Sequence, residues 1–309
     1  MANNTNETSV IAKIPSGVWV SLIALNIFPS IFATLGNVLI LVALQKVSSI
    51  HPPTKLLFRC LAVTDLCVGL LGQPLYVYVN YIGLHFDIGK FMVELQGVLE
   101  FVLVLLFAVS PLTSAAISVD RLLALLLGLR YRHVVTLRGA RVVIACVWFI
   151  AVSNASLLWV DFFQFSDKVY LASWWTFLAL IMVSIIISTF SYTKIFFTLR
   201  HQQAQVRDHV QPEQSSRGRS VLNIARYKKT VYSVAWIQFV MLACYGPFIV
   251  MAFLFHFGSI DFSTETRIAN DVSICLLFLN SSLNPVLYCW RIKDVRQEVK
   301  NTIRQCLCC

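Results

Sequence analysis

The sequence predicts an all-α membrane protein: a seven-transmembrane helix bundle with a short amphipathic C-terminal helix. Hydrophobic residues make up 58% of the 309 residues and charged residues only 13%, which is too apolar for a soluble domain of this length. Seven apolar stretches are long enough to cross a bilayer, which takes about 20 residues in a helix. They use up nearly the whole chain and leave no room for a soluble catalytic domain, so we expect no enzyme.

Polar or proline-containing segments separate these stretches. Pro52 and Pro53 forbid one continuous helix through the first two spans. The polar segment 200–226, which contains Pro212 and Gly218, is expected to be a cytoplasmic loop of low order. The expected spans are 17–44, 56–79, 92–127, 142–159, 169–197, 227–257 and 266–290. The chain then divides into an extracellular segment 1–16, a receptor-like bundle 17–290 and a cytoplasmic tail 291–309.

Basic residues are concentrated on one side of the predicted membrane bundle. All but four of the 25 Lys and Arg residues lie in or beside the segments after spans one, three, five and seven; the exceptions are Lys13, Lys90, Lys168 and Arg267. By the positive-inside rule, the N-terminus is extracellular and the C-terminus cytoplasmic, as in a multi-pass protein of the plasma membrane. The lipid bilayer thus accounts for the net charge of +10, and a nucleic-acid partner is disfavoured.

Two groups of residues predict modification. Asn3 and Asn6 lie in glycosylation sequons on the outer segment, whereas the sequons at Asn154 and Asn280 fall inside apolar spans and are discounted. Cys306, Cys308 and Cys309 follow an amphipathic stretch and suggest palmitoylation. That stretch repeats apolar residues every three to four positions, which predicts a helix lying on the membrane surface: Ile292, Val295, Val299 and Ile303. The predicted outer segments contain no cysteine, so no external disulfide is expected.

Several polar residues lie inside the spans. A charged group at the centre of a membrane helix costs about 2.5 to 3.5 kcal/mol on insertion scales, so such residues mark function by default. The alternative is a hydrogen-bonded network that only holds helices together. Pro247 and Pro285 would kink spans six and seven and offer hinges for a two-state switch. The polar residues are Asn37, Asp65, Ser110, Asn280, Ser281 and Asn284.

These motifs resemble the rhodopsin-like (class A) G-protein-coupled receptors across nearly the whole chain. The matching segments occur in order and each in its proper span: LGNVLI with Asn37, LAVTDL with Asp65, SAAISVDRLLAL with Asp120 and Arg121, Trp148, Tyr192, Pro247, and NPVLY with Asn284, Pro285 and Tyr288. The chain has no outer-loop cysteine and contains the sequence LRYRHVVT. In both features it resembles the melanocortin, adenosine, cannabinoid and lysophospholipid group of receptors.

The resemblance implies a receptor that binds an extracellular ligand and activates heterotrimeric G proteins by an outward swing of helix six. Arg121, paired with Asp120 at rest, would be freed on activation; Arg121 lies 11 residues after Ser110, about 16 Å along the same helix, which places it at the cytoplasmic rim. Arrestin and receptor kinases are further partners that it allows. The implied switch residues are Asp120, Arg121, Tyr192, Tyr245, Pro247, Asn284, Pro285 and Tyr288. The implied allosteric sodium site, with no other metal or cofactor, comprises Asp65, Ser110, Asn280 and Asn284.

The chain departs from the family pattern in its outer half and its trigger. Gln96 replaces the cysteine that usually begins span three, and Leu122 is the third residue of the usual DRY. Tyr245 stands where span six usually has a tryptophan. Ser184 stands where span five usually has a proline. The coupling end therefore follows the family more closely than the ligand end.

Charged residues on the predicted outer side indicate the class of ligand. Nine acids against four bases on the outer side would attract a cation. Glu100 lies 21 residues before Arg121, about 31 Å along the helix and near the outer rim. For most of these acids, Asp271 included, we prefer the interpretation of a solvated loop charge. For Glu94 and Glu100, a loop charge and a position facing a pocket are equally expected. Leu103 replaces the aspartate of aminergic receptors. A cationic peptide or amine, bound near Glu94, Glu100, Leu103 and Phe248, is favoured.

Other functions fit less well. A lipid or nucleoside receptor of the same family is the main alternative for the ligand. A membrane transporter is the alternative of another class, but the two halves show no internal repeat. A retinal photoreceptor would need a lysine in span seven, and ICLLFLNSSLNP has none. No cluster of His, Cys and Asp suggests catalysis.

Overall fold

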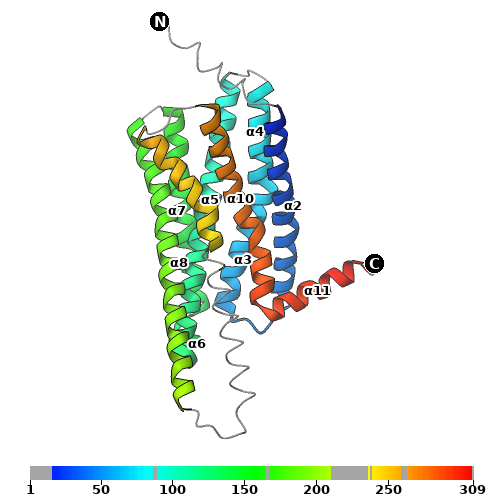
Figure 1. Ribbon diagram of the computed structural model, residues 1–309, viewed down its shortest axis with the longest axis vertical. Helices are drawn as coiled ribbons and strands as arrows, with labels where there is room; N and C mark the ends of the chain where they lie inside the picture. The colour runs from blue at the N-terminus through cyan, green and yellow to red at the C-terminus, as the bar shows by residue number, and fades with distance from the viewer. Residues whose placement is uncertain are drawn as a thin grey trace.

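The computed structural model describes residues 16–85, 89–164, 167–209, 236, 239–258 and 263–307, which are almost entirely helical. Within these ranges seven helices are long and apolar enough to cross a membrane. They stand side by side as one elongated bundle, with a further helix projecting sideways at one end (Figure 1). The predicted fold class is confirmed.

The helices occur in the order of the expected spans, but those of spans four and five extend well beyond the expected bounds. Span one is α2 (Ser16–Lys46), span three α5 (Lys90–Leu127), span four α7 (Leu137–Gln164), span five α8 (Asp167–His209) and span seven α10 (Thr264–Arg291). Span two is divided into α3 (Pro52–Cys67), the π-helical turn η2 (Val68–Gly72) and α4 (Gln73–His85). Span six is described over Phe239–His256. The short η3 (Gly128–Arg130) and α6 (Tyr131–Val134) connect α5 to α7.

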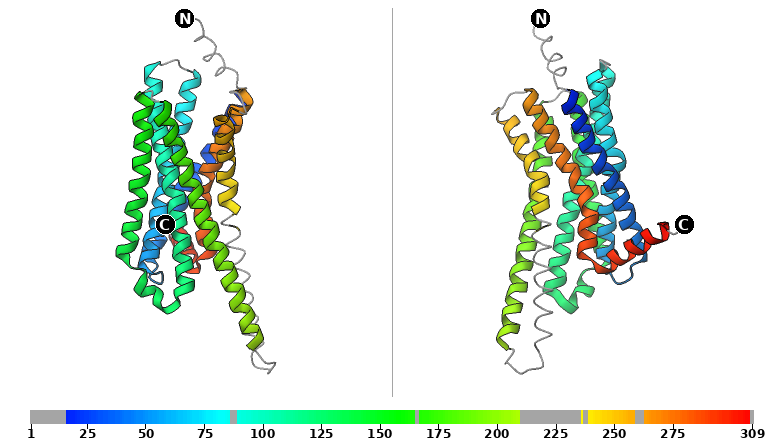
Figure 2. Two further views of the ribbon diagram at one scale, coloured as in Figure 1. Left: turned by 90° about the vertical axis from the view of Figure 1, so that its left-hand side faces the viewer. Right: turned by 45° about the vertical axis from the view of Figure 1, so that its right-hand side comes forward.

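Two chain connections are described in part, the one before α3 and the one after α8. Pro52 and Pro53 occupy the first turn of α3, where their missing N–H groups have no helical partner to lose. The expectation of low order from residue 200 is wrong for 200–209, because α8 continues to His209. Figure 2 shows this end of α8 reaching beyond the neighbouring helices. The remainder of the expected loop and the start of span six lie outside the described residues.

Helix α5 occupies the centre of the bundle and packs against α3, α7 and α8, while α10 packs against α2. Small residues permit close approach between helices. A Cβ atom on Gly36 would lie 2.8 Å from Cγ of Pro285, and one on Gly69 would lie 2.7 Å from Oγ1 of Thr34. Such spacing favours glycine at membrane helix contacts.

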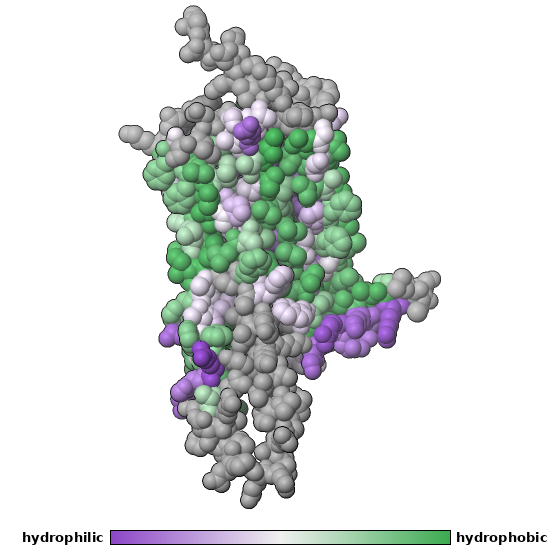
Figure 3. Space-filling model, viewed as in Figure 1, coloured by the Kyte–Doolittle hydropathy of each residue, from purple (hydrophilic) through white to green (hydrophobic). Residues whose placement is uncertain are grey.

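Apolar side chains cover the outside of the bundle (Figure 3). Phe28 and Phe32 on α2 are each 66% exposed and Phe149 on α7 is 74% exposed, which a lipid environment explains. The chain is therefore a multi-pass membrane protein. Asn154 and Asn280 are 4% and 6% exposed, which agrees with discounting their sequons.

Helix α11 (Lys293–Leu307) is the predicted amphipathic helix. Its hydrophilic side faces away from the bundle and its apolar side faces toward the apolar belt (Figure 3). Val295 is fully buried in a cluster with side chains of α2 and α3. Two polar contacts attach the helix to the first span and the loop after it: Ser49 with Asp294, and Lys46 Nζ with Gln305 Oε1 at 3.4 Å.

Candidate functional site

A polar network crosses the middle of the bundle around Asp65, whose side chain is fully buried. Asn284 on α10 donates a hydrogen bond from Nδ2 to Asp65 Oδ2 at 2.7 Å. Ser110 on α5 donates to Asp65 Oδ1 at 3.4 Å. Three of the four residues predicted for sodium are thus brought together from three helices.

Asn280, the fourth, is buried but makes no hydrogen bond to Asp65 among the described residues. The network continues instead through Asn37 on α2, which donates from Nδ2 to the backbone oxygens of Ala33 at 2.8 Å and Ser281 at 3.2 Å. Helices α2, α3, α5 and α10 therefore meet in one polar layer. The carboxylate of Asp65 and the hydroxyl of Ser110 supply oxygen atoms of the kind that hard cations prefer, so these residues fit a sodium ion, while Asn284 faces the carboxylate with its amide nitrogen.

Near the C-terminal end of α5, Asp120 accepts hydrogen bonds from two hydroxyl groups. Tyr131 of α6 donates to Asp120 Oδ1 at 2.6 Å, and Thr54 of α3 donates to Oδ2 at 2.9 Å. The Tyr131 ring also packs against His51, with ring centroids 5.1 Å apart. Because Asp120 is only 4% exposed, both of its oxygens depend on these protein donors rather than on water. The contact joins α3, α5 and the connection between α5 and α7.

Arg121 and Tyr288 of α10 contact the same aromatic ring. Arg121 Cζ lies 5.1 Å from the centroid of the Phe58 ring, within cation–π range. Tyr288 packs edge-on against the same ring, with centroids 5.0 Å apart. Tyr192 on α8 is 4% exposed and packs in a separate cluster with Leu122 and Ile195. Phe58 thus connects two of the predicted switch residues.

In span six, Tyr245 and Phe248 belong to the main hydrophobic core, with 1% and 8% of their surfaces exposed. Pro247 lies on the exposed side of the same helix. Tyr245 is therefore placed deep in the bundle, as a core trigger would need, although its hydroxyl gives it a different chemistry from tryptophan.

The two acids proposed for the ligand lie in different surroundings. Glu94 is exposed, whereas Glu100 is half-buried and accepts a hydrogen bond at Oε1 from the Tyr170 hydroxyl at 2.9 Å. A row of edge-to-face aromatic contacts leads inward from there: Tyr170 to Trp174 at 6.4 Å, Trp174 to Phe177 at 5.6 Å, and Phe177 to Phe248 at 6.3 Å. Leu103, one turn below Glu100, is half-buried against the same core.

The expectation that Asp271 is a solvated charge is wrong. Its side chain is 7% exposed and accepts a hydrogen bond at Oδ1 from the Tyr76 hydroxyl at 2.8 Å. The sequence argument that marked Asp65, a carboxylate inside an apolar span, applies to Asp271 as well and would have found it. Thr54, Phe58 and Tyr131 were also missed, because nothing in their own segments indicates what they contact.

Comparison with known proteins agrees with this arrangement. Residues 36–288 match the family model described as 7 transmembrane receptor (rhodopsin family). The chain therefore belongs to the rhodopsin-like, class A family of G-protein-coupled receptors, whose members signal and are not enzymes. This membership implies an extracellular ligand and coupling to a G protein.

Individual relatives are distant but match over most of their length. Melanocortin receptor 5 of Rattus norvegicus is 25% identical over 305 residues, covering 92% of this chain and 85% of the relative. Adenosine receptor A2b of Gallus gallus is 26% identical, covering 93% and 89%. Adenosine receptor A3 of Ovis aries is 24% identical, covering 94% and 92%. The predicted resemblance to the group containing melanocortin and adenosine receptors is confirmed.

Proposed function

We propose that this chain is a plasma-membrane receptor that binds an extracellular cationic peptide or amine and activates a heterotrimeric G protein. The observation that carries the proposal is that both carboxylate oxygens of Asp120 accept hydrogen bonds from the protein. Tyr131 and Thr54 satisfy both oxygens of this carboxylate, directly beside Arg121 at the cytoplasmic end of α5. Breaking those bonds would change the surroundings of Arg121, which a G protein could then engage.

Activation would proceed by an outward swing of helix six. Support comes from the aromatic row that joins Glu100 and Tyr170 at the outer end to Phe248 in span six. A ligand that displaced Tyr170 would disturb packing one turn from Tyr245. Pro247 and Pro285 would provide hinges in spans six and seven, since proline interrupts helical hydrogen bonding.

The proposed orientation puts Asn3 and Asn6 outside as glycosylation sites and Cys306, Cys308 and Cys309 inside for palmitoylation. Cys306 is exposed at the end of α11, while the other four lie outside the described residues. Palmitoyl chains there would add to the membrane contact of the apolar face of α11.

The ligand is best sought by screening cells that express the receptor with a promiscuous G protein against peptides, amines, nucleosides and lipids. The adenosine receptors among the relatives make a nucleoside the second candidate. A response confined to nucleosides or lipids would reject the cationic ligand and leave the receptor function in place.

Glu100→Gln is expected to weaken activation by a cationic ligand at least tenfold while surface expression stays normal. The change removes the charge that would attract the ligand but keeps a hydrogen-bond acceptor for Tyr170. Concentration–response curves for the first activator from the screen measure the effect. Glu265→Gln is the control, because Glu265 is an exposed acid on α10 that lies outside the proposed ligand-binding set. Equal potency of Glu100→Gln and wild type would exclude Glu100 as the ligand's counter-ion.

Sodium is expected to stabilise the resting receptor through Asp65. At ten times its dissociation constant, sodium should raise the Tm of the purified protein by about 3 °C relative to potassium. Asp65→Asn should remove this rise, because the ion loses its only charged ligand in the layer. Glu265→Gln, at an exposed position on α10, should keep it. A sodium effect that survives in Asp65→Asn would place the ion elsewhere.

A further inference from the structure

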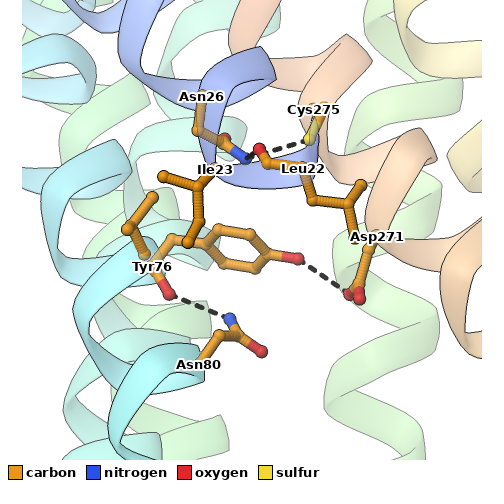
Figure 4. A pocket seen from close by; sticks show the side chains of 8 residues that line it. Leu22, Ile23, Asn26, Tyr76, Asn80, Asp271 and Cys275 are labelled. Carbon is orange, nitrogen blue, oxygen red and sulfur yellow. Dashed lines mark hydrogen bonds between the residues drawn. The ribbon is translucent and has the colours of Figure 1, made fainter. Parts of the chain in front are cut away.

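A second polar cluster lies in the outer half of the bundle, between α2, α4 and α10 (Figure 4). It surrounds a cavity of about 10 Å³, room for one group the size of a water molecule. The walls combine aliphatic and polar side chains: Leu22, Ile23, Asn26, Tyr76, Val77, Asn80, Asp271 and Cys275. This cluster is separate from the layer around Asp65 and takes no part in the proposed coupling mechanism.

Two oxygen atoms of the cluster are buried and have no hydrogen-bond partner among the described residues. Asn26 donates from Nδ2 to Leu22 O at 2.8 Å and Cys275 Sγ at 3.1 Å, but its Oδ1 accepts nothing. Asp271 accepts from Tyr76 at Oδ1, but its Oδ2 accepts nothing. Both side chains are more than nine-tenths buried, at 2% and 7% exposed. Buried acceptors of this kind are normally satisfied, so the cluster lacks a hydrogen-bond donor.

The missing donor should carry positive charge. Asp271 supplies a carboxylate; the Arg267 guanidinium on the same helix acts on it electrostatically but makes no ion pair with it in the described part of the chain. Cys275 and the aliphatic walls are poor ligands for an alkali ion, which prefers several oxygens. The sulfur atom and the aliphatic walls suit an organic cation, whose carbon atoms can pack against them. Asn26 and Val77 also line a larger apolar groove of about 410 Å³ between α2 and α4, which has space for a carbon skeleton.

We propose that this cluster binds a primary ammonium group of a small amine. The ammonium would donate to Asp271 Oδ2 and to Asn26 Oδ1, and its third N–H would be directed toward Asn80 on α4. Its size matches the cavity, and two of its three N–H donors match the two unpaired acceptors. The site goes beyond the proposed function, since binding here requires neither Glu100 nor a G protein.

The test is a thermal-unfolding titration of the purified full-length receptor in sodium-free buffer. Methylammonium chloride is the probe, and tetramethylammonium chloride is the control, with equal charge but no N–H donor and a larger volume. Methylammonium should raise Tm by about 3 °C above the control at ten times its dissociation constant. Asp271→Asn, which retains a partner for Tyr76, should weaken the dissociation constant at least tenfold, and Asn26→Leu should do the same. Glu265→Gln, exposed on the same helix, should leave it unchanged.

Three outcomes would overturn the proposal. Equal effects of the two salts on the wild type would mean that the cavity holds only water. A methylammonium effect that both Asp271→Asn and Asn26→Leu retain would place the binding elsewhere. A sodium effect equal to that of methylammonium, and lost in Asp271→Asn, would identify an alkali-ion site. Because none of these measurements uses a G protein, they stand whatever the result of the coupling experiments.

Discussion

Replacing Arg121 by alanine is expected to reduce receptor-stimulated nucleotide exchange to the rate of the G protein alone. Arg121 lies near the C-terminal end of α5 over the ring of Phe58 and follows Asp120 directly in the chain. Alanine removes the guanidinium that would pair with polar or charged atoms of the G protein. Purified receptor mixed with G protein and a labelled GTP analogue gives the rate directly, even without a known ligand if basal exchange is measurable.

The matched control is Arg138→Ala, which replaces an exposed arginine at the start of α7. It should retain exchange close to the wild-type rate. Surface expression and Tm must be measured for both variants, so that loss of folding is not mistaken for loss of coupling. A folded Arg121→Ala variant with undiminished exchange would contradict the proposed coupling site.

Tyr131→Phe is expected to raise ligand-independent exchange by about tenfold. The variant keeps the ring beside His51 but removes the hydroxyl that donates to Asp120 at 2.6 Å. A hydrogen bond to a charged group contributes about 1.5 to 3 kcal/mol. If that bond exists only in the resting state, its loss shifts the resting–active equilibrium about tenfold or more toward activity.

Basal exchange in membranes with matched receptor amounts measures this shift. Tyr78→Phe provides the control, because Tyr78 lies on α4 with 52% of its surface exposed. Lower or unchanged basal exchange in Tyr131→Phe would show that the bond to Asp120 does not hold the resting state.

The sequence predicted the fold well because lipid imposes a strong and local rule. Each apolar stretch must form a helix to satisfy its own backbone, so length and hydropathy suffice to locate it. The buried polar layer was predicted for the same reason: Asp65, Ser110 and Asn284 stand out against apolar neighbours. Helix α11 followed from the spacing of Val295 and Val299.

The contacts between distant segments were not predicted. Tyr131 and Asp120 are joined across a turn whose shape no periodicity reveals, and Thr54 reaches the same carboxylate from 66 residues away. Asp271 and Tyr76 are 195 residues apart. Which side chains of two helices meet depends on their rotation about their own axes, and hydropathy determines that angle only coarsely.

The π-helical turn Val68–Gly72 affects how this receptor can be compared with its relatives. Its wider turn is closed by a hydrogen bond from the Gln73 N–H to the Val68 oxygen, five residues back, and accommodates one residue more than an α-helical turn. That extra residue rotates everything beyond it by about 100°, which directs Gln73 and Tyr76 into the bundle. In a relative whose second span lacks the turn, the residue facing inward would stand one position earlier in an ungapped alignment. Ligand contacts inferred from such an alignment would be assigned to the wrong side chains of α4, and a one-residue gap after Asp65 would correct them.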